Sequence, residues 1–315
     1  MTIKETTMLP EFEYDIQGNF IKDAPLGSKS WFGCGGNADI LFEPASLDDL
    51  SLFLREYPEQ EPLTILGGMA NCIIRDGGIR GIVIQLGKQF AEIEVEGNRI
   101  LAGAGALNGS VASAAAKAGI GGLEFLSGIP GTVGGALSMN AGAYGSEVSD
   151  ILIAALAMTR EGRTMPYGPS DLQMGYRTCI PPEGTVFTGA VFEGKEEATE
   201  TVRERLKTIK EQRRATQPIT EKTGGSTFAN PKPEELEKAN LPEGTRAWQL
   251  VERVGGRGLS IGGAQMSEKH CNFMLNTGAA AASDLENLGD ELIRRVREEC
   301  GLELHWEIKR LGDSL

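Results

Sequence analysis

Three residues of this chain have side chains and local settings suited to charge stabilisation or proton transfer. Arg177 lies in MGYRTC, and its planar guanidinium suits a carboxylate or an enolate. Ser226 lies in TGGSTFANP, a glycine turn that presents its hydroxyl without the adjacent histidine that a nucleophilic serine needs. Glu307 falls on the polar face of the alternating tail LELHWEIKRLG. Each also has an ordinary interpretation, as a solvated arginine, a serine bonded to its own turn and a carboxylate facing water.

Glycine-rich segments offer a second kind of chemistry, the binding of an anionic group by backbone N–H groups. Glycine accounts for 42 of the 315 residues, nearly twice the usual ~7%. The segment LGGMANCIIRDGG (66–78) runs from a strand into a turn that suits a pyrophosphate, although on its own an ordinary turn explains it better. The segment GLEFLSGIPGTVGGALSMNAGAYGSE (122–147) is too long and irregular for a simple connection, so it predicts a cofactor cradle.

Cysteine and histidine usage excludes several kinds of site. The five cysteines are scattered, odd in number and lack a C-x-x-C pair, so neither a disulfide framework nor a zinc site is predicted. Cys34 and Cys271 are interpreted as small buried residues. The two histidines, His270 and His305, are too few for most histidine-based metal or triad chemistry. We therefore expect no metal.

The charge and the hydrophobic pattern restrict the classes of binding partner that we expect. A net charge of −13 repels polyanions, so we expect no nucleic acid and no acidic membrane surface as a partner. No stretch of eighteen apolar residues occurs, and the N-terminal MTIKETTMLPEFEYD lacks the pattern of a signal sequence. We therefore expect a cytoplasmic protein without membrane insertion, and nothing in the pattern indicates an obligate protein partner.

Hydrophobic periodicity predicts the elements that position these segments. The N-terminal part reads as a β-α-β unit, followed by a hairpin that turns at Gly97-Asn98 and by glycine-rich loops with at most a short helix. A final helix is predicted with a capping box of Ser283 and Glu286 and an end at Gly301. The predicted strands are 38–44, 63–66, 79–86, 151–158, 185–194 and the alternating tail, and the predicted helices are 46–57, 108–118, 195–214 and 284–299.

These segments, in this order, resemble the UDP-N-acetylenolpyruvoylglucosamine reductase family, also called UDP-N-acetylmuramate dehydrogenase or MurB. The resemblance rests on SGIPGTVGGA, NAGAYG, GYR, GS-x-F-x-NP and GGA-x-x-S-x-KH-x-NF, and it covers roughly residues 27–312. Each motif alone is modest, whereas the five together are highly specific. No long insertion separates Arg177 from VFTGAVF, so the chain is similar to the shorter subtype.

The resemblance implies an α+β fold, with a two-part FAD-binding domain of the vanillyl-alcohol-oxidase (PCMH) type and a smaller C-terminal α+β substrate domain. We expect two FAD-binding subdomains at 1–88 and 89–214 and the substrate-binding domain at 215–315. The implied reaction is the NADPH-dependent, FAD-mediated reduction of UDP-N-acetylglucosamine-enolpyruvate to UDP-N-acetylmuramate, a step in peptidoglycan precursor synthesis. FAD would be bound noncovalently.

The resemblance also implies roles for individual residues. Arg177 and Glu307 would stabilise or polarise the enolate, and Ser226 would donate the proton. The implied FAD contacts are Gly67, Gly68, Met69, Ala70, Asn71, Gly128, Ile129, Pro130, Gly131, Thr132, Gly134, Gly135, Ala136, Asn140, Gly142 and Tyr144. The implied contacts to the UDP-sugar are Tyr176, Asn230, Lys269 and His270.

Two other functions are compatible with the same pattern. One is a carbohydrate or alcohol oxidase on the same flavin fold; many of these attach FAD to a histidine, and no histidine precedes His270 here. The other is a non-catalytic flavin- or sugar-nucleotide-binding protein. Ala70, Cys179 and Ala229, where the family commonly has serine, serine and lysine, leave room for it, whereas the retained catalytic candidates speak against it.

Overall fold

The computed structural model describes residues 12–315. Residues 1–11, part of the stretch in which we expect no signal sequence, lie outside the described residues. The chain forms two compact units: unit 1 contains Asp39–Gly68, Gly81–Arg213 and the N-terminal stretch up to Asp23, and unit 2 contains Ala24–Ala38, Met69–Arg80 and Arg214–Leu315. Within residues 12–315, none of the helices combines the length and the apolar character that a membrane span needs.

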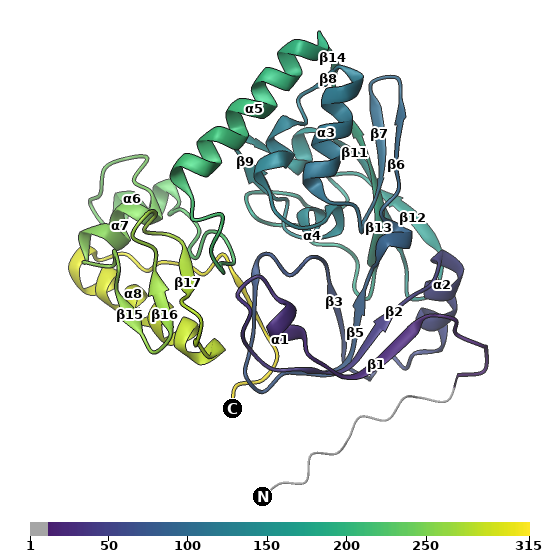
Figure 1. The fold of residues 1–315 in the computed structure, drawn as a ribbon, viewed down its shortest axis with the longest axis horizontal. Helices are drawn as coiled ribbons and strands as arrows, with labels where there is room; N and C mark the ends of the chain where they lie inside the picture. Colours follow the sequence, from purple (N-terminus) through teal and green to yellow (C-terminus); the bar gives the residue numbers. More distant parts are fainter. Residues whose placement is uncertain (1–11) are drawn as a thin grey trace, which may run out of the picture. The chain divides into compact units, whose positions relative to one another are not determined.

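The first layer of unit 1 is a four-stranded sheet in the order β1-β2-β5-β3 (Figure 1). The predicted β-α-β unit corresponds to β2, α2 and β3, and β5 lies between β2 and β3 in the sheet, parallel to β3. Ser46 caps the connecting helix as predicted, because its Oγ accepts the N–H of Asp49 at 3.1 Å. Phe42 and Phe53 stack in the core beneath this helix. The elements are β1 (Asn19–Ala24), β2 (Ala38–Glu43), α2 (Leu47–Glu56), β3 (Leu63–Leu66) and β5 (Ile79–Gln85).

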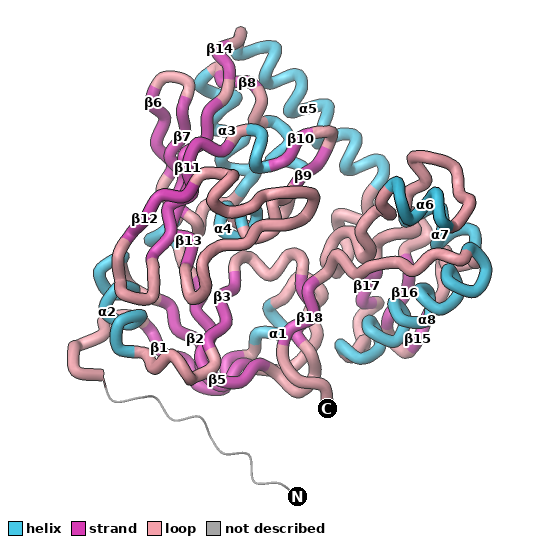
Figure 2. Tube along the Cα trace, turned by 180° about the vertical axis from the view of Figure 1, so that it is seen from behind, coloured by secondary structure: helices cyan, strands magenta, loops and turns pink. Residues whose placement is uncertain are grey.

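The second layer of unit 1 is an antiparallel sheet in the order β12-β11-β13-β7-β6. The predicted hairpin forms its β6–β7 edge, and α3 and α4 pack on one face of the sheet (Figures 1 and 2). The glycine-rich stretch contains only short elements, as predicted. The elements are η1 (Lys88–Phe90), β6 (Ile93–Glu96), β7 (Arg99–Gly103), α3 (Asn108–Ala118), β8 (Ile120–Gly121), η2 (Glu124–Gly128), α4 (Val133–Leu137), β9 (Gly142–Ala143), β10 (Ser146–Glu147), η3 (Val148–Asp150), β11 (Leu152–Met158), β12 (Thr164–Tyr167) and β13 (Val186–Glu193).

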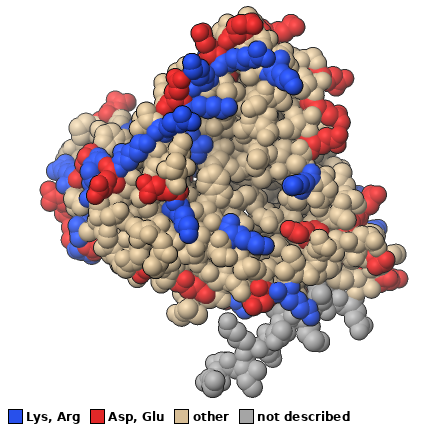
Figure 3. All heavy atoms as spheres, in the orientation of Figure 1, with Lys and Arg blue, Asp and Glu red and all other residues tan. Residues whose placement is uncertain are grey.

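The long charged helix α5 (Thr199–Thr216) begins later than the predicted start at residue 195. The reason is that β14 (Lys195–Glu196) pairs with β8 and keeps the chain extended there. Although the whole chain is acidic, basic side chains gather along α5 on the face shown in Figure 3. The helix also carries three glutamates, and its Arg205 is paired with Glu124 and Glu197. Its basic residues are Arg203, Arg205, Lys207, Lys210, Arg213 and Arg214.

Unit 2 is built on a three-stranded antiparallel sheet in the order β15-β16-β17, against which α8 packs (Figure 2). The short strands β4 and β18 form a separate parallel pair. Phe32 and Ile73 come from distant parts of the sequence and are fully buried in the core with residues of α7 and α8. The elements are α1 (Leu26–Lys29), β4 (Cys72–Ile74), α6 (Pro233–Lys238), α7 (Ala247–Arg253), β15 (Ser260–Ile261), β16 (Ala264–Met266), β17 (Met274–Asn276), α8 (Ala282–Cys300) and β18 (Lys309–Leu311).

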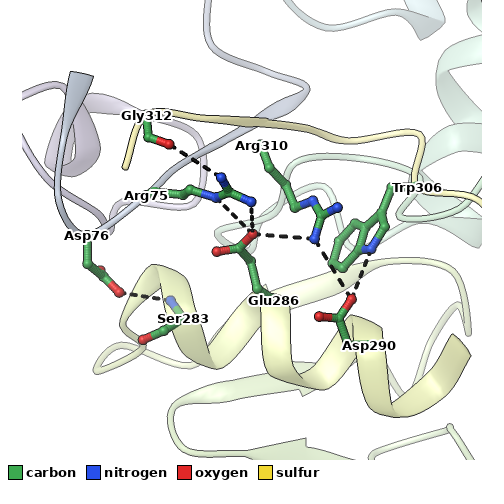
Figure 4. Close-up of polar contacts among 8 residues, drawn as sticks. All are labelled: Arg75, Asp76, Ser283, Glu286, Asp290, Trp306, Arg310 and Gly312. Carbon is green, nitrogen blue, oxygen red and sulfur yellow. Dashed lines mark hydrogen bonds and ion pairs between the residues drawn. The ribbon is translucent and has the colours of Figure 1, made fainter. Parts of the chain in front are cut away.

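The predicted capping box of α8 is wrong, whereas its predicted end at Gly301 is confirmed by a left-handed φ of 66°. The helix begins at Ala282, and the carboxylate of Asp76 accepts the N–H groups of Ala282 and Ser283, both at 2.9 Å. Figure 4 shows the bond to Ser283. Glu286 does not reach back to the backbone, because it binds Arg75 at 3.0 Å. A carboxylate far away in the sequence thus satisfies the first turn of the helix.

The strand predicted in the alternating tail is also shorter in the structure than we expected. Only Lys309–Leu311 form β18, because the three-residue strand β4 is the partner available to it. The preceding residues keep the predicted alternation in burial, with Leu304 and Ile308 buried. Glu307 therefore lies in an extended connection before the strand and not within it.

Candidate active site

The two glycine-rich segments of unit 1 approach each other backbone to backbone. A Cβ added to Gly68 would lie 3.1 Å from the Cα of Gly131, and one added to Gly67 would lie 2.7 Å from the Oγ1 of Thr132. Gly131 itself has a φ of +94°, which other residues rarely adopt. The turn after β3 and the loop 128–136, which we call the cradle loop, therefore lie against each other, and their contact with a cofactor stays a prediction.

The cradle loop is held by the segment that follows β7. The N–H groups of Val133 and Gly134 donate to the carbonyls of Ala106 and Ala104, both at 2.9 Å. Thr132 caps α4 by accepting the N–H of Gly135 at 3.4 Å. Of the other predicted cofactor contacts here, Ala136 is buried, whereas Ile129 and Pro130 are partly exposed. These bonds fix the backbone of the loop.

Gly128 and Tyr144 are neighbours at one end of the cradle loop. A Cβ at Gly128 would fall on the Tyr144 ring, so only glycine permits this packing. The Tyr144 hydroxyl donates to the carbonyl of Ile209 in α5 at 3.4 Å. Burial raises the pKa of Tyr144, and the phenol is therefore neutral at neutral pH.

Asn108, which the sequence analysis did not select, lies at the cradle loop with an unpartnered amide. Its backbone N–H donates to the carbonyl of Gly131 at 3.1 Å. Its side chain is buried, and neither the amide oxygen nor the amide nitrogen has a hydrogen-bond partner within the described part of the chain. An unsatisfied buried polar group costs about 1–3 kcal/mol. A polar ligand such as FAD fits this site because it would supply the missing partner; the signal in the sequence was a single asparagine in the run GALNGSVASAAA.

Arg177 lies in a strained turn that rests on the same part of unit 1. Its φ is +54°, a left-handed conformation that is uncommon for a long side chain. The guanidinium donates to the carbonyl of Gly142 at 2.8 Å and lies 5.2 Å above the ring of Tyr176, which is about half exposed. Backbone strain at a polar turn of this kind is typical of functional sites. Nearby, burial raises the pKa of Cys179 to about 11, so its thiol stays neutral.

The predicted cofactor residue Asn140 makes hydrogen bonds to two other segments of unit 1. Its side chain is fully buried. It donates to the carbonyl of Gly175 at 2.9 Å and to the Oγ of Ser149 at 3.3 Å. The amide thus contacts the Arg177 turn, and its predicted contact with the cofactor stays a prediction.

In unit 2, the continuation of the first glycine-rich turn is tied to the segment that carries Glu307. Met69 has a left-handed φ of 51°, and Ala70 is buried. The side chain of Asn71 donates to the backbone carbonyl of Glu307 at 3.1 Å, and its own carbonyl accepts the N–H of Lys309 at 3.0 Å. Two predicted site segments that are more than 200 residues apart therefore share one set of hydrogen bonds.

Ser226 and Glu307 are brought together by the backbone of unit 2. The N–H of Glu307 donates to the carbonyl of Thr227 at 2.8 Å, next to Ser226 in the sequence. On the other side, Ser226 forms a bridge with Phe273. The side chain of Asn272 accepts the N–H of Phe228 at 2.9 Å and donates to its carbonyl at 2.8 Å. Asn272 lies in the predicted motif but was not selected, and it holds the strand-like segment that carries Ser226.

The residues predicted to bind the sugar nucleotide in unit 2 all contact protein groups. Asn230 accepts the N–H of Ala247, at the start of α7, at 3.2 Å. Lys269 donates to the carbonyl of Arg214 at 2.6 Å, near the C-terminus of α5. His270 accepts the N–H of Asn272 at 3.2 Å through Nδ1, and burial lowers its pKa, so it is mainly neutral at neutral pH. Their contacts with the substrate stay predictions.

Residues 12–315 contain no group of three or more His, Cys, Asp or Glu side chains arranged to hold a metal ion. All five cysteines are unpaired thiols. Of the two interpreted as small buried residues, Cys271 is buried and Cys34 is only partly so.

Two family models match the chain. One, described as FAD binding domain, matches residues 38–166. The other, described as UDP-N-acetylenolpyruvoylglucosamine reductase, C-terminal domain, matches residues 217–311.

Proteins named UDP-N-acetylenolpyruvoylglucosamine reductase are similar to the chain over nearly its whole length. The protein from Maricaulis maris is 48% identical over 298 residues, which cover 94% of this chain and 93% of the length of that protein. That from Paramagnetospirillum magneticum is 48% identical over 305 residues, 97% of this chain and 94% of its own. The crystal structure of the reductase from Thermus caldophilus has a TM-score of 0.77 at 32% identity and covers 94% of this chain and 99% of that chain. The similarity therefore includes both the flavin-binding part and the C-terminal part.

Proposed function

We infer that this chain, which belongs to the UDP-N-acetylenolpyruvoylglucosamine reductase family, reduces UDP-N-acetylglucosamine-enolpyruvate to UDP-N-acetylmuramate in peptidoglycan precursor synthesis. The reaction uses NADPH and FAD. The glycine-rich approach of Gly68 to Gly131 and the unpartnered amide of Asn108 beside it fit a bound flavin. When bound there, FAD would supply the hydride chemistry that links NADPH oxidation to reduction of the enolpyruvyl methylene carbon.

The chain's own residues manage the charge and the proton of this reaction. Reduction at the methylene carbon places negative charge on the neighbouring carbon and its carboxylate. Arg177 binds that carboxylate through its guanidinium, and Glu307 polarises the developing enolate. Ser226 donates the proton from Oγ to the carbon that bears the ether oxygen, and solvent restores the hydroxyl proton. A serine is a weak acid, so the basicity of the enolate and the exclusion of water must assist the transfer.

One observation carries the assignment of Ser226 and Glu307. The hydrogen bond from the N–H of Glu307 to the carbonyl of Thr227, at 2.8 Å, fixes the two segments next to each other in unit 2. A shared role of the two residues requires that these segments, 80 residues apart in the sequence, lie side by side, and this bond supports that arrangement.

We propose further that FAD is bound noncovalently, that the reaction takes place in the cytoplasm, and that residues 215–315 bind the UDP-sugar while 1–88 and 89–214 bind FAD. The absence of a histidine before His270 supports noncovalent binding. Flavin colour that stays in the protein pellet after acid precipitation would contradict it and favour the oxidase alternative.

The half-reactions test the function and the role of Ser226 separately. Flavin absorbance is followed by stopped flow, first during reduction by NADPH and then during reoxidation by the enolpyruvyl sugar nucleotide. In Ser226→Ala, reduction stays close to wild type, while reoxidation slows by the ~10²–10⁴-fold that a general acid contributes. Ser226→Cys, which keeps an ionisable proton, recovers part of the rate. Ser260→Ala, an exposed serine of the same unit, is the matched control.

Three outcomes would count against the proposal. A flavin that NADPH does not bleach in the wild-type protein would favour a non-catalytic binding protein. Equal slowing of both half-reactions in Ser226→Ala would point to a disturbed flavin site. Normal reoxidation would remove Ser226 from the mechanism.

A further inference from the structure

We propose that Asn140 is a positioning residue that orients Arg177 through the backbone carbonyl of Gly175. The inference rests on the proposed role of Arg177 in the reaction. Asn140 follows the cradle loop in the sequence, and Arg177 lies in the turn 174–178. Both belong to unit 1, so their arrangement is set within one compact body.

The first argument is that the amide of Asn140 makes three hydrogen bonds to protein groups. Its side chain has no exposed surface. The nitrogen donates to the carbonyl of Gly175 at 2.9 Å and to the Oγ of Ser149 at 3.3 Å, while the oxygen accepts the N–H of Ser149 at 2.9 Å. The backbone is left-handed at φ 43°, a conformation that asparagine tolerates better than most residues. Both the residue type and the backbone geometry therefore serve this one set of contacts.

The second argument is that Gly175 closes the turn that carries Arg177. The carbonyl of Gly175 accepts the N–H of Thr178 at 2.9 Å, and the N–H of Gly175 donates to the carbonyl of Thr178 at 3.1 Å. Asn140 donates to the same carbonyl and so satisfies its second lone pair. The turn between these two residues contains only Tyr176 and Arg177. A shift of Gly175 would therefore move Arg177 with it.

The third argument is that the other end of the arginine returns to the same segment. The Arg177 guanidinium donates at 2.8 Å to the carbonyl of Gly142, two residues after Asn140. Residues 140–142 therefore contact both the turn that carries Arg177 and the guanidinium at the end of its side chain. A left-handed φ at Arg177 persists only where surrounding contacts determine it, and these two anchors supply such contacts. These contacts hold the Arg177 side chain in one conformation, so little conformational freedom is lost when it binds a carboxylate.

A misplacement of about 1 Å in a catalytic group can slow a reaction ~10²-fold. Removing the Asn140 amide should therefore affect the step that needs Arg177 and leave the earlier flavin chemistry intact. Asn140→Gly removes the side chain and keeps the left-handed backbone accessible. Asn140→Asp keeps the acceptor for the Ser149 N–H and replaces the donor that faces Gly175 by an oxygen. Ser149→Ala is the matched control, because it removes the other acceptor of the amide nitrogen and leaves the bond to Gly175.

The experiment is a double-mutant cycle between Asn140 and Arg177 in the flavin-loaded, full-length protein. For each variant, the flavin content, the rate of reduction by NADPH and the rate of reoxidation by the enolpyruvyl sugar nucleotide are measured. We expect Asn140→Gly and Asn140→Asp to slow reoxidation by ~10–100-fold and to change reduction much less, with both rates measured on flavin-saturated protein because Asn140 is also a predicted cofactor contact. In the Arg177→Ala background, either change should have no further effect, because the group that it orients is gone. Ser149→Ala should reoxidise at close to the wild-type rate.

The outcomes separate this inference from the proposed function. Wild-type reoxidation in Arg177→Ala would reject the role of Arg177 itself. Slow reoxidation in Arg177→Ala with normal rates in both Asn140 variants would reject the positioning role alone. Additive effects in the double variants, or equal slowing of both half-reactions in the Asn140 variants, would show that Asn140 supports the fold or the cofactor site and does not act through Arg177. If Asn140→Gly does not fold, Asn140→Asp still decides the question.

Discussion

At the scale of single residues, Arg177 combines a proposed chemical role with a backbone conformation that opposes stability. Its φ of +54° is costly for any residue with a Cβ and nearly neutral for glycine. We predict that Arg177→Gly is more stable than Arg177→Ala by about 1 kcal/mol, while both variants are equally slow in flavin reoxidation. Urea denaturation and stopped-flow absorbance measure the two properties. If the glycine variant is the less stable one, the turn is not strained in the way that its φ indicates.

Local patterns in the sequence were sufficient to select some of the candidate site residues but not others. Arg177, Ser226 and Glu307 stood out because their chemistry and their glycine-rich settings are visible in the sequence. Asn108 did not, because nothing local distinguishes an asparagine that starts a helix at the surface from one that is buried without a partner. Its burial results from the approach of the cradle loop, and that approach is a tertiary contact.

At the scale of elements, the short helix α4 depends on glycine where it contacts Ala104, the residue after β7. A Cβ added to Gly134 would lie 3.1 Å from the Cβ of Ala104 and 3.3 Å from its carbonyl oxygen. We predict that Gly134→Val displaces the cradle loop and empties the flavin site, because the branched side chain cannot avoid these atoms. The measurement is the flavin-to-protein absorbance ratio of the purified variant.

Two controls accompany this prediction. Gly109→Val also places a valine in a helix, but a Cβ there meets nothing within 4 Å, so its flavin content should be normal. Trp31, Trp248 and Trp306 all belong to unit 2, so tryptophan fluorescence reports whether that unit is still folded. Normal flavin occupancy in Gly134→Val would reject the assignment of the cradle loop.

At the scale of the whole molecule, unit 2 is assembled from three separate stretches of sequence. Glu286 of α8 pairs with Arg75 at 3.0 Å and with Arg310 at 3.5 Å, and Asp76 caps the helix (Figure 4). The core contains Phe32 and Ile73, and the side chain of Asn276 donates to the carbonyl of Phe32 at 2.8 Å. The C-terminal stretch therefore relies on partners that precede it by about 200 residues in the sequence.

We predict from this assembly that the isolated segment 215–315 does not fold cooperatively. Without residues 24–38 and 69–80 it lacks part of its core and the cap of its longest helix, and it leaves buried polar groups unpaired. Thermal unfolding followed by circular dichroism and by the fluorescence of Trp248 and Trp306 tests this, with the full-length chain as the reference. A sharp melting transition of the fragment, with tryptophan emission like that of the intact protein, would contradict it.

The sequence by itself determined most of the elements and the family. Periodicity located the β-α-β unit, the hairpin, α3 and the sheet strands, because these depend on nearby residues and on which face is apolar. The five motifs, read in order, identified the family and hence the flavin reaction. The predicted cap of α8 failed, as did the long terminal strand, because a helix end or a strand end takes whichever partner the fold brings to it. Here those partners were Asp76 and the short strand β4.

Only the tertiary structure decided how the candidate residues are held. Asn140 and Gly175 are 35 residues apart, and Thr227 and Glu307 are 80 residues apart, so no local pattern records that they are bonded. The same holds for the close approach of Gly68 to Gly131 and for the assembly of unit 2 from three stretches. The physical reason is that a residue's type limits which bonds it can make, whereas the packing of distant segments selects which of those bonds are made.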